Sequence, residues 1–90
     1  MIFVGYNPFD IDAGFIYRIE KGQLIDDITN IPSTINDLAK AAAAYAYKFN
    51  DFDINFKPEF AQDTEEFINA INCYEMMNYN ENKITVREVE

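Results

Sequence analysis

The sequence predicts a single α/β domain, in which a mixed sheet of five strands is combined with two helices. The chain has 90 residues, the size of one domain with one modest core. A hydrophobic fraction of 49%, with eight Phe and six Tyr, supplies bulky side chains for that core. Apolar residues alternate along some segments and recur at helical spacing along others, so both strands and helices are expected within residues 1–90.

Three strands are predicted in the first third of the chain. Residues 2–6 are apolar and aromatic, and they end before an Asn-Pro pair, where proline disfavours helix in the preceding residue. Residues 13–20 and 23–28 are two further β-prone segments. Only Lys21 and Gly22 separate them, so a hairpin is expected there.

The first helix is predicted to begin near Ser33 or Thr34, because either hydroxyl can cap the first turn. The residues after it repeat at the spacing of one helix face, and the small alanines among them allow close packing on a sheet. The apolar residues of this face are Ile35, Leu38, Ala42, Tyr45, Ala46 and Phe49.

The second half of the chain repeats the strand–helix pattern. Residues 52–56 alternate between apolar and polar, which is typical of a strand with one buried face. Asp63 and Glu66 have the spacing of a capping box, so a second helix is expected from there to about Tyr79. A final β-prone segment spans residues 83–89. The predicted core-facing residues of the second helix are Phe67, Ala70, Ile71, Tyr74 and Met77.

The net charge of −9, from sixteen acidic and seven basic residues, points to the class of partner. Such a surface repels phosphate and anionic lipid, so we expect no direct binding of nucleic acid or membrane, and instead a protein partner with a basic surface. The chain starts without a basic leader and has no apolar stretch of about 18 residues, which predicts a cytoplasmic protein. Cys73 has no second cysteine to pair with and is expected to be an inert thiol in or near the core.

Residues 4–9, Val-Gly-Tyr-Asn-Pro-Phe, resemble the first strand of the ribonuclease H-like superfamily, in particular its Holliday-junction-resolvase branch. The similarity covers residues 2–28 by motif, and the rest of the chain by the predicted element order βββαβαβ, so the resemblance implies a ribonuclease H-like fold. Family members carry a metal-binding aspartate where this chain has Asn7, and an amide lacks the charge that holds a divalent cation. Glu59 and Glu75 are the nearest matches to the other two family acids, so the resemblance implies a fold without the complete metal site.

The leading functional hypothesis is a non-catalytic interaction protein that docks on the basic surface of a nucleic-acid-handling enzyme. Small acidic inhibitor proteins of phages and mobile elements resemble this chain in size and charge, which would place it in the host cytoplasm. Protection of sheet edges by acids, and burial of the tyrosines, are the alternative explanations. The predicted partner-binding residues are Asp26, Asp27, Tyr47, Asp51, Asp53 and Met76.

Two further hypotheses stay open. Asp10, Asp12 and Glu59 could converge on Mg²⁺ in a minimal nuclease, although loop acids more often satisfy turn backbones. Apolar helix faces could instead assemble a homodimer or larger homo-oligomer. The chain has no histidine and no glycine-rich phosphate loop, so no cofactor and no catalytic residues are predicted for the leading hypothesis.

Overall fold

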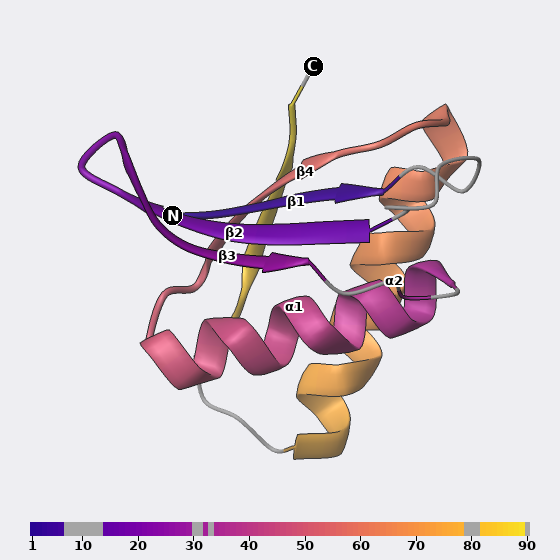
Figure 1. Ribbon diagram of the computed structural model, residues 1–90. Helices are drawn as coiled ribbons and strands as arrows, with labels where there is room; N and C mark the ends of the chain where they lie inside the picture. Colours follow the sequence, from indigo (N-terminus) through magenta and orange to yellow (C-terminus); the bar gives the residue numbers. More distant parts are fainter. Residues whose placement is uncertain (7–13, 30–31, 33, 79–81, 90) are drawn as a thin grey trace.

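The computed structural model describes residues 1–6, 14–29, 32, 34–78 and 82–89; for residues 26–29 and 78 it describes the backbone alone. The domain is a five-stranded mixed sheet with two helices, as predicted (Figure 1). In chain order, the elements are β1 (Ile2–Tyr6), β2 (Gly14–Glu20), β3 (Gln23–Thr29), α1 (Ile35–Phe49), β4 (Asp53–Lys57), α2 (Ala61–Asn78) and β5 (Thr85–Glu88).

The strands lie in the order β3-β2-β1-β4-β5. β1, β2 and β3 are antiparallel neighbours, whereas β4 is parallel to both β1 and β5. Lys21 and Gly22 have positive φ angles of 54° and 78°, the backbone that a two-residue hairpin loop requires at both positions. This confirms the hairpin predicted between residues 20 and 23.

α1 is capped at both ends and packs on the sheet through small residues. The Thr34 hydroxyl accepts a hydrogen bond of 3.1 Å from the Asp37 N–H, which confirms the predicted N-cap. Asn50 adopts the left-handed conformation after the last turn and donates its N–H to the Ala46 carbonyl. Four alanines of this helix have no exposed surface, so α1 can approach β1 and β4 closely: Ala39, Ala42, Ala43 and Ala46.

α2 begins at Ala61, two residues earlier than its predicted cap. Asp63 is inside the first turn, where its buried carboxylate accepts a 3.0 Å hydrogen bond from the Phe60 N–H. In a capping box, the side chain of the third helical residue accepts a hydrogen bond from the backbone N–H of the cap residue. Asp63 has this role toward Phe60, whereas the sequence analysis expected Glu66 to have it toward Asp63. Phe67 anchors the helix to the sheet, because its ring stacks on that of Phe56 at a centroid distance of 4.2 Å.

Both helices lie on the same face of the sheet (Figure 1). Alternate strand residues such as Val4, Ile16 and Ile54 point toward the helices and form the core with them. Within the described part of the chain, no element covers the opposite face. We call that side the outer sheet face; it is formed by Phe3, Phe15, Tyr17, Asp53, Asn55, Lys57, Thr85 and Arg87.

Candidate functional site

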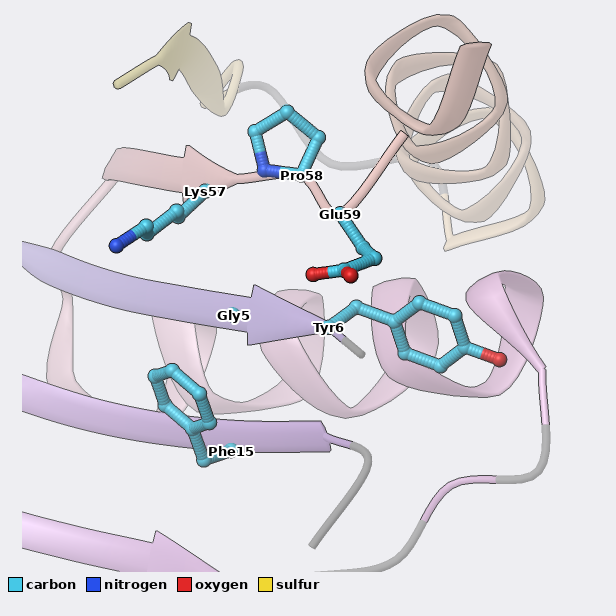
Figure 2. A pocket seen from close by; sticks show the side chains of 6 residues that line it. All are labelled: Gly5, Tyr6, Phe15, Lys57, Pro58 and Glu59. Atoms are coloured by element: carbon cyan, nitrogen blue, oxygen red, sulfur yellow. The ribbon is translucent and has the colours of Figure 1, made fainter. Parts of the chain in front are cut away.

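A pocket of about 200 Å³ opens on the outer sheet face, where β1 and β4 end side by side (Figure 2). Its wall is aromatic because Gly5 has no side chain: a Cβ at this position would lie 2.1 Å from Cζ of Phe15. The Phe15 ring therefore lies against the β1 backbone and stacks on Tyr17 at 4.9 Å. The pocket is lined by Gly5, Tyr6, Phe15, Lys57, Pro58 and Glu59.

The pocket carries one charge of each sign. In Figure 2 the Glu59 carboxylate points toward the end of β1, whereas the Lys57 side chain extends away from it along the sheet. Both side chains are exposed, and no ion pair joins either of them to another described residue. Adjacent ends of parallel strands are a common place for ligands in α/β sheets. The pocket is therefore a candidate ligand site.

The structure describes only one of the three residues of the predicted metal site. Glu59 is at the pocket, but Asp10 and Asp12 lie outside the described residues, so their convergence with Glu59 stays a prediction. Among the residues that are described, no group of three potential ligands could hold a metal ion. Glu75 accepts a hydrogen bond from the Ile84 N–H, just before β5 begins. Since β5 is parallel to β4, this is the end of the sheet opposite to Glu59.

The acidic pairs predicted to bind a partner differ in their surroundings. Asp26 and Asp27 lie on β3, an edge strand, but their side chains are outside the description. Asp51 is half-buried: its carboxylate pairs with the Met1 amino group and accepts a 3.4 Å hydrogen bond from the Asp53 N–H. Asp53 is exposed, but β4 lies between β1 and β5. The expectation that Asp53 lines a sheet edge was therefore wrong.

Tyr47 lies where α1, α2 and the segment before β4 meet. Its ring packs against those of Tyr74 at 6.0 Å and Phe52 at 5.7 Å. The hydroxyl oxygen is buried and has no hydrogen-bond partner among the described residues. Burial, followed by the nearby Glu75 carboxylate and Tyr74, raises the pKa of Tyr47 above its usual value. This tyrosine mainly joins the two helices, and its role toward a partner stays a prediction.

The exposed face of α2 is the second candidate site. Met76 and Met77 are 76% and 77% exposed, and Cys73 beside them is exposed too. The expectations that Met77 faces the core and that Cys73 is buried were therefore wrong. In Figure 1 the C-terminal end of α2 extends past α1. Tyr74 and Glu75 contact other elements there, whereas Cys73, Met76 and Met77 are on the exposed side of the helix. Glu65 and Glu66 are exposed nearer the N-terminal end.

The composition of residues 61–78 also predicts this exposed face. Residues 61–78 contain four acidic side chains and no lysine or arginine, in a helix whose apolar stripe includes only two fully buried residues, Phe67 and Ile71. A helix of this composition has a wide solvent face. We name the exposed acidic and sulfur-bearing residues of this helix the α2 outer face: Glu65, Glu66, Cys73, Met76 and Met77.

Neither helix of the described chain combines the length and the apolar character that crossing a bilayer requires. Searches for similar proteins were made among protein-family models, curated proteins and solved structures. None of the three gave a match to this chain.

Proposed function

We propose that this chain is a non-catalytic interaction protein that binds the basic surface of a nucleic-acid-handling enzyme. The observation that carries the proposal is the α2 outer face, which presents Glu65 and Glu66 in a helix without a single basic residue. An enzyme groove built to hold phosphate offers complementary lysines and arginines. Occupation of that groove by this protein would exclude nucleic acid, as a phage-type inhibitor of a host enzyme does.

The apolar part of the same face supplies affinity that charge alone does not. Exposed ion pairs contribute only about 0–1 kcal/mol each, because both partners remain solvated. Met76 and Met77 add flexible, polarisable side chains, a residue type that is enriched in interfaces. Of the other residues proposed for partner binding, Asp26, Asp27 and Asp53 remain candidates for a second contact. Asp51 and Tyr47 already have partners within the chain.

We also propose that the fold is ribonuclease H-like. The strand order β3-β2-β1-β4-β5, with β2 antiparallel to both of its neighbours, supports this assignment. So do the two helices that follow β3 and β4. In this proposal the chain keeps the architecture of a metal-dependent nuclease and, with Asn7 in place of an aspartate, has lost its first metal ligand.

The test is capture of enzymes from a bacterial lysate by the immobilised protein, followed by competition between the protein and duplex DNA for each recovered enzyme. We expect binding to weaken strongly between about 50 mM and 200 mM salt. The double variant Glu65→Gln/Glu66→Gln should reduce capture and competition. Asp37→Asn/Glu59→Gln removes the same charge at other exposed positions and serves as the control. Equal loss in both variants, or capture that ignores salt, would contradict the proposal.

A second candidate function, a minimal metal-dependent nuclease, is favoured by one observation. The Glu59 carboxylate points toward the end of β1 (Figure 2). In the sequence, β1 is followed directly by the segment that contains Asp10 and Asp12. Cleavage of DNA or RNA that requires Mg²⁺, and that Glu59→Gln abolishes without unfolding the chain, would establish this function. Activity that survives Glu59→Gln would point to a contaminating nuclease.

A further inference from the structure

We infer that this protein associates with itself head to tail, with the α2 outer face of one copy lying on the outer sheet face of the next. The inference goes beyond the proposed function, since it assigns a ligand to the sheet face that no described element covers. It rests on two surfaces of the same molecule that match in chemistry and in spacing. The partner is a second copy of this chain.

The receiving surface has a simple layout in two rows across the sheet. Register places Tyr17, Phe3, Asn55 and Arg87 side by side on four successive strands. The neighbouring row runs from Phe15 across Gly5 to Lys57. In each row the aromatic ring is at the β2 end and the cation is at the β4–β5 end.

The aromatic half of this surface consists of three rings that contact one another and are half-buried: Phe3, Phe15 and Tyr17. Phe15 and Tyr17 stack at 4.9 Å, and Phe3 contacts Tyr17 at 6.3 Å, so the three rings form one continuous apolar patch. Lys57 and Arg87 are exposed, and neither forms an ion pair with another described residue. This face thus presents Lys57 and Arg87 without an ion pair among the described residues, together with the exposed Asp53 on β4. The two cations are the groups that an acidic segment of a partner would contact.

The α2 outer face has the opposite pattern in the same order. Glu65 and Met76 are about three turns apart and therefore share one side of the helix; Glu66 and Met77 form a parallel pair. The separation within each pair is about 16 Å along the helix axis. On the sheet, Tyr17 and Arg87 are three strand spacings apart, which is about 14 Å.

The matching separations place the acidic and sulfur-bearing side chains of the α2 outer face over complementary side chains of the outer sheet face. With α2 laid across the strands, its acidic half lies over Lys57 and Arg87 while Met76 and Met77 lie on the aromatic rings. Thioether sulfurs contact ring edges favourably, and each carboxylate meets a cation that forms no ion pair with another described residue. The side of the sheet without cover among the described elements then gains a helix, as its other side already has.

The area and the geometry set the affinity and the type of assembly. A five-stranded face of five-residue strands projects to roughly 400 Å², about half of what each partner buries in a standard interface, so we expect a Kd weaker than about 1 µM. The helices lie on the opposite side of the sheet from the receiving surface (Figure 1). In a pair of copies, the helix face of one copy therefore occupies the sheet face of the other, while the second helix face and the second sheet face stay open. Further copies bind to these open surfaces, so the assembly extends as a chain.

Two single-surface variants test this arrangement. Met76→Asp blocks the helix side at an exposed position, and Arg87→Glu blocks the sheet side on an edge strand. Sedimentation velocity from about 10 µM to 1 mM should show concentration-dependent assembly of the wild type and monomers for each variant alone. An equimolar mixture of the two variants should form a 1:1 dimer, because one intact helix face meets one intact sheet face. Lys40→Glu, an exposed charge reversal on α1, should behave as the wild type.

Every other outcome overturns the inference. A dimer of Met76→Asp alone would show that sheet faces pair with each other, and a dimer of Arg87→Glu alone would show that helix faces do. A monomeric wild type over the whole range, or a mixture that stays monomeric, would remove self-association through these surfaces. Circular dichroism of each variant confirms folding. Arg87→Glu keeps the acidic helix, so it should still capture basic enzymes, which separates this test from that of the proposed function.

Discussion

Phe67→Ala should be among the most damaging single substitutions in this domain. Phe67 has no exposed surface, and its stacking on Phe56 is the main aromatic contact between α2 and the sheet. Replacing a buried phenylalanine by alanine costs about 3–5 kcal/mol, because the apolar contacts are lost and a cavity remains. A domain of this length is stable by roughly 5–13 kcal/mol, so the variant loses a large share of its stability.

The assay is urea unfolding followed by far-UV circular dichroism, since the chain has no tryptophan to report by fluorescence. With an m-value of about 1.5 kcal/mol/M, the midpoint should fall by about 2–3 M urea. Met77→Ala, in the same helix but 77% exposed, is the control and should change stability by less than about 0.5 kcal/mol. A loss below about 1 kcal/mol for Phe67→Ala would refute the reasoning, because it would mean that α2 does not depend on this anchor.

Four further outcomes follow from local structure. Tyr47→Phe should leave stability unchanged or raise it by up to about 1–3 kcal/mol in urea unfolding at neutral pH, because it removes a buried hydroxyl without a partner; a clear loss would reveal a hydrogen bond. The raised pKa of Tyr47 means that the folded state holds the phenol proton more tightly than the unfolded state does. The free energy of unfolding is therefore unaffected by this group below about pH 10 and declines above it, and the decline should be smaller in Tyr47→Phe than in the wild type. Thr34→Ala should cost about 0.5–2 kcal/mol in the same assay by uncapping α1, whereas Thr34→Ser should cost little. Gly5→Ala should displace the Phe15 ring and weaken the near-UV dichroism of its stack with Tyr17; an unchanged spectrum would show that the ring does not lie over Gly5.

The order of elements was predictable because each one has its own period in the sequence. Alternation along residues 52–56 and helical spacing after Thr34 both depend on one local feature, namely which side of the element is buried. Positions of caps were less certain, because Asp63 can act either before a helix or inside its first turn. The parallel pairing of β1 with β4 joins distant segments and leaves no local pattern.

The candidate sites were harder to predict, because they depend on where the covering elements end. Met77 continues the helical spacing of the residues that pack on the core, and Cys73 belongs to a residue type that is usually buried, but both are exposed near the end of α2. Phe15 and Tyr17 belong to a run that is apolar on both sides of a strand. Such a run is expected when both faces are covered, and here one face has no cover in the described chain.

The position of β1 at the centre of the sheet has a consequence for how the domain forms. Its antiparallel partner β2 is the next strand in the chain, but its parallel partner β4 follows only after α1. During synthesis, β1, β2 and β3 can pair before β4 has been made, so one side of β1 has no strand to bond with until Ile54 and Phe56 arrive. Closure of this long loop is the slow step expected for the domain, and until it happens an open apolar strand is available to other nascent chains.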